Sequence, residues 1–75
     1  MTKTTYGEDD LAALAKKYRE ATGKTRAEVA RELGVSRPSL AIAEDNPSAS
    51  LTKLRIRIIE AYSPHKVLGP RYWLE

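Results

Sequence analysis

Residues 25–45 carry the pattern that most restricts how this chain can fold, because they predict two short helices joined by a tight turn. Thr25 is a favourable N-cap residue, and Glu28 three positions later completes a capping box at the start of the first helix. Gly34 follows the last apolar residue of that helix. A helix often ends at such a position in the left-handed conformation that glycine adopts at low cost.

The second helix of the pair is predicted to begin at Ser36 or Arg37. Pro38 fixes this start, because proline is tolerated in the first turn of a helix, where its missing N–H is not needed. Leu40 and Ala43 are three residues apart and are expected to face inward.

The first helix places Val29, Ala30 and Leu33 at helical spacing, so they are expected to share one buried face. The small Ala30 lies where a crossing helix must come close. Gly34 and Val35 then form the corner between the two helices. By spacing alone, the pair could also be a plain helical hairpin inside some other bundle.

The capping box, the small residue, the glycine and the inward positions together resemble the helix-turn-helix of the phage repressor and Cro family, also called the Xre family. The resemblance covers about residues 8–62 and is densest over residues 25–45. It implies that the second helix of the pair lies in the major groove of DNA.

A further helix is expected before this pair. Its apolar residues recur at helical spacing, namely Leu11, Leu14, Ala15, Tyr18 and Ala21. Acidic residues at positions 8–10 suit the positive end of the helix dipole, and Gly23 is expected to end the helix. Residues 1–7 are polar and unpatterned, and they are predicted to be a flexible terminus.

Residues 51–62 have an ambiguous period. Alternation over residues 54–58 is typical of a strand, whereas Leu51, Leu54, Ile58 and Tyr62 also fit one helical face. The family has a helix here, so the resemblance favours a helix, with Ile56 off its main apolar face. The predicted fold is therefore all-α, a compact four-helix domain over residues 8–62 with a short β-prone tail.

The tail, residues 63–75, contains the large apolar side chains of two short runs: Val67, Leu68, Tyr72, Trp73 and Leu74. These residues are β-prone. One interpretation is a hairpin that covers the helical core, and the other is a strand that pairs with its twin in a second subunit. We favour dimerisation, since a chain of 75 residues buries a modest core and has no disulfide to stabilise it.

Composition excludes several classes of site. The chain has no cysteine and one histidine, so neither a metal site nor a cofactor is expected. It lacks a Gly-rich phosphate loop and a nucleophile with an identifiable base, so the protein is not expected to be an enzyme. No stretch approaches the roughly 18 apolar residues of a membrane span, and the N-terminus has no signal-peptide core. We expect a cytoplasmic protein.

In the family, the start of the second helix contacts base edges. Arg37 is the natural candidate, because a guanidinium can donate twice to guanine O6 and N7. Ser39 could bond a base or a phosphate, and the remaining members of the face are Pro38, Ala41 and Ile42. Ala41 and Ile42 could pack on thymine methyl groups. Known members often carry amides here, so the alternatives are reliance on Arg37 and DNA shape, or a protein-binding face.

Phosphate contacts are expected to flank this helix. The resemblance assigns them to Arg26, Ser36, Lys53 and Arg55. The net charge is +3, and residues 51–62 hold three basic residues against one acidic residue, which suits a phosphate-binding segment. The resemblance also implies an ion pair between Arg19 and Glu44, which would close the pair of helices against the preceding one.

The function implied is sequence-specific binding of double-stranded DNA by a homodimer. Two copies would place their second helices in successive major grooves, about 34 Å apart, on a pseudo-palindromic site. Repression is favoured over activation, as in a Cro-like repressor or an antitoxin that also binds a toxin. The alternative is a protein-interaction module that uses the Ile42 face or the tail.

Overall fold

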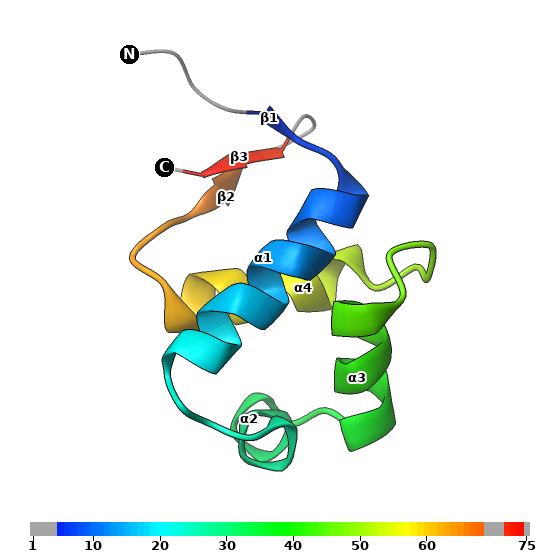
Figure 1. Ribbon diagram of the computed structural model, residues 1–75, viewed down its shortest axis with the longest axis vertical. Coiled ribbons are helices and arrows are strands. Elements are labelled where there is room, and N and C mark those ends of the chain that lie inside the picture. Colours follow the sequence, from blue (N-terminus) through cyan, green and yellow to red (C-terminus); the bar gives the residue numbers. More distant parts are fainter. Residues whose placement is uncertain (1–4, 69–71, 75) are drawn as a thin grey trace.

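The computed structural model describes residues 5–68 and 72–74 of the chain. Over these residues the chain forms four helices and three short strands (Figure 1). In chain order they are β1 (Thr5–Tyr6), α1 (Glu8–Ala21), α2 (Arg26–Leu33), α3 (Arg37–Asp45), α4 (Thr52–Tyr62), β2 (Val67–Leu68) and β3 (Tyr72–Leu74). The predicted mostly helical fold is confirmed.

Local signals set the bounds of α2. The Thr25 hydroxyl accepts a hydrogen bond from the Glu28 backbone N–H, and the Glu28 carboxylate accepts one from the Thr25 N–H, both at 3.1 Å. Gly34 ends the helix at φ 70° and ψ 33°, in the left-handed region. The Val35 N–H then donates back to the Ala30 carbonyl at 2.9 Å. Both predicted ends of this helix are confirmed.

The core lies where α1 packs against α3 and α4. Its fully buried apolar side chains come from all four helices: Leu11, Ala15, Val29, Leu40, Ala43, Ile58 and Ile59. α2 closes the opposite end of the molecule from the strands (Figure 1). Ala21, which was expected on the apolar face of α1, is exposed at the end of the helix.

Residues 52–62 form a helix, so the strand alternative for residues 54–58 is wrong. Leu54 and Ile58 are buried, while Leu51 and Tyr62 pack against the core as partly buried side chains. Ile56 was expected to lie off the apolar face. It is instead half-buried and packed against the core.

The strands form one antiparallel sheet in the order β1-β3-β2. Tyr6 is paired with Tyr72, and Val67 with Leu74. The prediction that residues 1–7 form a flexible terminus is therefore wrong for β1 (Thr5–Tyr6), and residues 1–4 lie outside the described residues. A strand of two residues is too short to show alternation, and its partner lies more than 60 positions away.

Candidate nucleic-acid interface

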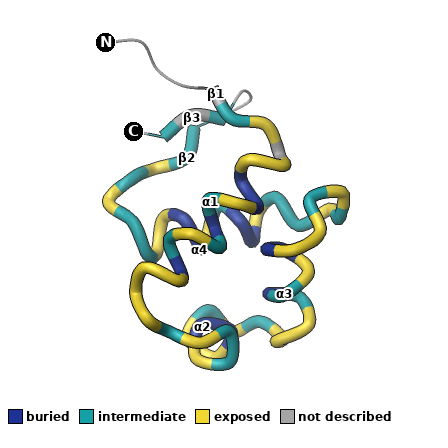
Figure 2. The backbone as a smooth tube through the Cα atoms, in the orientation of Figure 1, coloured by how far each residue is buried: buried dark blue, intermediate teal, exposed yellow. Residues whose placement is uncertain are grey.

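α3 has one face in the core and one face in solvent (Figure 2). Leu40, Ala43 and Glu44 are buried, whereas Arg37, Pro38 and Ile42 are exposed. The residues between the two sides, Ser39 and Ala41, are half-buried. The five residues predicted to contact bases thus lie on the part of α3 that is open to solvent. We call this surface of Arg37, Pro38, Ser39, Ala41 and Ile42 the α3 face.

Arg37 is the cation of the α3 face. It occupies the first position of α3, after the N-cap residue Ser36. Its guanidinium group makes no hydrogen bond or ion pair with any residue in the described part of the chain, and the residue is exposed. A cation in this state keeps all five N–H donors available to a partner.

Next to Arg37 the surface has a small depression between the first turns of α2 and α3. It is lined by Arg26, Arg37, Pro38 and Ala41, and its wall is almost entirely apolar. The depression thus combines a proline ring, an alanine methyl group and the stems of two arginines. It is suited to receive a small apolar group that lies beside a hydrogen-bond acceptor.

A wider groove runs on the other side of the α3 N-terminus, towards the start of α4. Its lining includes Ser36, Ser39, Lys53 and Arg57 together with the apolar residues Val35, Leu51 and Leu54. Two of the predicted phosphate contacts, Ser36 and Lys53, are therefore brought together in one groove. Lys53 is exposed, and Arg57 is held in place by a hydrogen bond to the Leu33 carbonyl at 2.6 Å.

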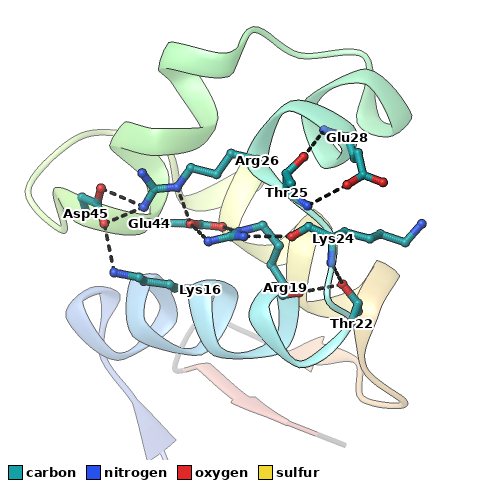
Figure 3. Close-up of polar contacts among 9 residues, drawn as sticks. All are labelled: Lys16, Arg19, Thr22, Lys24, Thr25, Arg26, Glu28, Glu44 and Asp45. Carbon is teal, nitrogen blue, oxygen red and sulfur yellow. Dashed lines mark hydrogen bonds and ion pairs between the residues drawn. The ribbon is translucent and has the colours of Figure 1, made fainter.

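The ion pair between Arg19 and Glu44 is present, and it forms the centre of a network that joins three helices (Figure 3). Arg19 donates from Nε to Glu44 Oε2 at 2.6 Å and from a terminal nitrogen to Oε1 at 3.0 Å. It also donates to the Lys24 carbonyl at 3.0 Å. The Glu44 side chain is completely buried, so these bonds replace the water that its charge would otherwise hold.

Arg26 belongs to the same network. Its Nε donates to Glu44 Oε1 at 2.9 Å, and a terminal nitrogen donates to both Asp45 oxygens at 2.8 and 2.9 Å. The hydrogen bond to Glu44 raises the pKa of Arg26. Arg26 lies at the start of α2, as predicted, but its pairing with Glu44 and Asp45 was not predicted. Its charge is compensated within the protein, which makes it a weaker candidate for a phosphate contact than Lys53.

Asp45 lies at the solvent edge of this network and also pairs with Lys16, at 3.6 Å. Partial burial opposes ionisation of its carboxyl, but the hydrogen bond and the charge of Arg26, with a contribution from Lys16, lower the pKa of Asp45 overall. The negative charge of Asp45, the last residue of α3, is thus paired with two cations. This arrangement removes a source of repulsion towards an anionic partner.

The prediction that Arg55 contacts phosphate is wrong. Arg55 is fully buried, donating from Nε to the Ala43 carbonyl at 2.8 Å and from a terminal nitrogen to the Asn46 carbonyl at 2.7 Å. It therefore satisfies carbonyls at the C-terminal end of α3, where a positive charge is favourable. Helical spacing places Arg55 on the same side of α4 as Ile58 and Ile59, and that signal could have revealed its burial.

The tail folds back on its own chain. Val67, Tyr72 and Leu74 are half-buried and pack against the core, and the Val67 N–H donates to the Glu60 carboxylate at 3.0 Å. Leu68 is also half-buried but is not part of this packing. The side chain of Trp73 lies outside the described part. These tail residues thus cover the core within one chain, as the first interpretation of the tail expects, and the dimer contact stays a prediction.

A second polar cluster joins α2 to α4. Glu32 accepts hydrogen bonds from Lys24 Nζ and from the Tyr62 hydroxyl, each at 2.6 Å. These bonds lower the pKa of Glu32, the bond from Lys24 having the larger effect. Burial, together with the hydrogen bond to Glu32, raises the pKa of Tyr62 to about 12. The Tyr62–Glu32 hydrogen bond thus links the end of α4 to α2.

Within the described ranges, no helix has the length and apolar character needed to cross a membrane. The same residues contain no group of three or more histidine, acidic or cysteine side chains that could hold a metal ion. No family model matches the chain, and neither the curated proteins nor the solved structures searched contain a match.

Proposed function

We propose that this protein is a sequence-specific DNA-binding regulator in which α2 and α3 act as a helix-turn-helix and α3 enters the major groove. The observation that carries the proposal is the exposed Arg37, which has no partner in the described part of its own chain and lies at the first turn of α3. A bidentate contact from such an arginine to guanine gives about 1–3 kcal/mol of discrimination between bases.

Backbone contacts are proposed for the groove beside the α3 N-terminus. Ser36, Ser39 and Lys53 line this groove together, so a strand of DNA that follows it meets the hydrogen-bonded serine pair at the start of α3 and a positive charge. Arg26 is proposed chiefly to orient α2 against α3, since its charge is already compensated by Glu44 and Asp45.

The regulator is proposed to act as a homodimer on a pseudo-palindromic site, with repression by promoter occupancy as its mode of action. In the proposed dimer, two copies meet at the sheet end, and each places α3 in one of two successive major grooves about 34 Å apart. A Cro-like repressor and an antitoxin with a toxin partner both fit this description.

The proposal is tested by selection from random duplex DNA, followed by a salt titration of the enriched duplex. We expect an inverted repeat that binds far more tightly than random DNA at about 150 mM salt. Arg37→Ala should reduce binding of the selected duplex about tenfold or more. Arg31→Ala is the matched control, because Arg31 is exposed at the end of α2 and lines neither the groove nor the depression.

If nothing is enriched, or if Arg37→Ala binds the selected duplex as well as Arg31→Ala does, this proposal is overturned. A protein-interaction module is then the better hypothesis. It is favoured by Ile42, the large apolar side chain with the highest exposure among the described residues, at 43%. In that case an Ile42→Lys variant should abolish capture of the partner protein.

A further inference from the structure

We propose that the α3 face recognises a guanine together with the C5-methyl group of a neighbouring pyrimidine, so that thymine methyl groups beside guanine contribute directly to affinity. The inference rests on the proposed DNA-binding function and specifies which DNA the site prefers. It follows from which polar groups on the α3 face are free and which are already engaged within the protein.

Hydrogen-bonding capacity on this face is concentrated in Arg37. The Ser39 hydroxyl accepts a hydrogen bond from the Ser36 hydroxyl at 2.8 Å, and the Ser39 N–H donates to the same Ser36 oxygen at 3.1 Å. The Ser36 hydroxyl proton is therefore used within the N-cap of α3, whereas Ser39 keeps its own hydroxyl proton as one free donor. Residues 37–45 contain no asparagine or glutamine, the side chains that pair with adenine.

The acidic residues of α3 are engaged as well. Glu44 is completely buried between Arg19 and Arg26. Asp45 is paired with Arg26 and Lys16, so a cytosine amino group would have to compete with two cations for its oxygens. The contacts with base edges for which the α3 face has free groups are therefore a guanidinium contact to guanine, one hydrogen bond from the Ser39 hydroxyl, and apolar contacts.

The depression supplies the apolar contact at a defined place. Pro38 and Ala41 line it, and Arg37 forms its edge, so a group seated there lies next to a base bonded by Arg37. Arg26 forms the other edge, with its guanidinium group held by Glu44 and Asp45. The apolar group that base edges present in the major groove is the C5-methyl of thymine, which 5-methylcytosine shares.

The experiment uses the full-length protein and the selected duplex. The guanine bound by Arg37 is the one that the parent prefers and Arg37→Ala does not. In one set of duplexes, the thymines next to this guanine are replaced by deoxyuridine, which removes the methyl group and leaves the base pairing intact. Binding is measured by fluorescence anisotropy at fixed salt. We expect affinity to fall about fourfold for each methyl group removed from the depression, the effect of exposing one buried carbon. Where cytosine replaces the same thymine, 5-methylation of that cytosine should restore most of the methyl contribution.

A protein variant connects the effect to the depression. Ala41→Ser places a hydroxyl group in its wall, and this variant should distinguish thymine from deoxyuridine less well than the parent does. Ala13→Ser, at an exposed position of α1, is the matched control and should discriminate as the parent does. Loss of discrimination in Ala41→Ser alone supports the proposal.

The two proposals fail in different ways. Equal affinity for the thymine and deoxyuridine duplexes overturns methyl recognition while leaving sequence-specific DNA binding in place. Equal discrimination by Ala41→Ser and the parent also overturns it, because the methyl group is then recognised elsewhere. Absence of any preferred duplex overturns the DNA-binding function itself, and methyl recognition with it.

Discussion

The Glu44 carboxylate is completely buried and accepts hydrogen bonds from Arg19 and Arg26. Breaking a buried pair of this kind leaves charge without a partner, which costs about 3–5 kcal/mol. We therefore expect Glu44→Gln to lower the free energy of unfolding by that amount, since an amide leaves the buried Arg19 guanidinium without an anionic partner and removes one of the two partners of Arg26. Urea unfolding at neutral pH, followed by circular dichroism, measures the loss.

Asp45→Asn provides the control for this prediction. It removes one negative charge from the same network, but the Asp45 side chain is 49% exposed and its partners can turn to water. The loss of stability should be far smaller than for Glu44→Gln. Similar losses in the two variants would show that the burial of Glu44 does not increase its contribution to the free energy of unfolding.

Two neighbouring cations of α4 should behave in opposite ways. Arg55 is buried and donates to the Ala43 and Asn46 carbonyls, so Arg55→Ala should lower the free energy of unfolding by at least about 2 kcal/mol. Lys53 is exposed in the proposed phosphate groove, so Lys53→Ala should leave stability within about 0.5 kcal/mol of the parent.

The effect of Lys53 on DNA binding can be measured apart from stability. Lys53→Ala should reduce the slope of log affinity against log salt by about one, as expected when one phosphate contact is lost. Binding isotherms at four or more salt concentrations measure this slope. An unchanged slope in Lys53→Ala would remove Lys53 from the interface.

Among the helices, α2 depends on hydrogen bonds to ionised carboxylates at its N-terminal end. The backbone hydrogen bond of Thr25 lowers the pKa of Glu28, with further help from the Thr25 side chain. Because its pKa is lower in the folded protein than in the unfolded chain, the unfolded chain binds more protons as the pH falls. The stability from this carboxylate is present above the ordinary pKa of about 4.3 and is lost as the pH falls through the folded value.

Acidification should therefore lower the melting temperature of the protein, and Glu28→Gln should flatten that dependence. Glutamine preserves the capping geometry but does not titrate in this range. Thermal unfolding recorded from pH 7 down to pH 3 tests the expectation. Glu20→Gln, at an exposed position of α1, is the matched control and should keep the slope of the parent. A Glu28→Gln profile as steep as that of the control would contradict this role of Glu28.

The elements that could be predicted from the sequence are those with local signals. The Thr25–Glu28 capping box, the left-handed Gly34 and the position of Pro38 each depend on neighbours within a few residues, and they gave α2 and α3 correctly. Part of the candidate site could also be predicted from the sequence. Once Leu40 and Ala43 are expected to face inward, helical spacing gives the residues on the exposed side of α3.

Features that depend on distant partners were missed. The strand Thr5–Tyr6 exists because Tyr72–Leu74 lies beside it, and neither segment shows this in its own sequence. Helical spacing could have indicated the burial of Arg55, but its bonds to the Ala43 and Asn46 carbonyls depend on where α3 ends, which is a tertiary property. Asp45 was likewise assigned no partner, although Arg26 and Lys16 both reach it from other helices.

The two surfaces proposed to bind DNA and to join subunits lie at different places along the 36 Å axis of the molecule. The sheet lies at one end, and α2 lies at the other, with α3 along the side (Figure 1). A dimer formed at the sheet end would therefore leave both copies of the α3 face open to DNA. This arrangement makes the sheet the preferred place to look for the interface between subunits.

Two adjacent residues of β2 allow the interface to be tested without disturbing the core. Val67 packs against the core, whereas Leu68 is half-buried and does not take part in that packing. If the sheet joins two copies, Leu68→Lys should convert a dimer into a monomer, because a lysine charge cannot be buried there without a partner. Light scattering gives the mass of each species, and circular dichroism verifies that the helices are retained.

Val67→Ala tests the packing of the tail on the core separately from the proposed dimer contact. It removes apolar volume from the core and should lower the free energy of unfolding by about 1–3 kcal/mol, while the dimer mass stays unchanged. A Leu68→Lys variant that keeps the mass of the parent dimer would move the interface away from β2. A parent protein that is monomeric at micromolar concentration would instead require the two half-sites of the DNA to bring the subunits together.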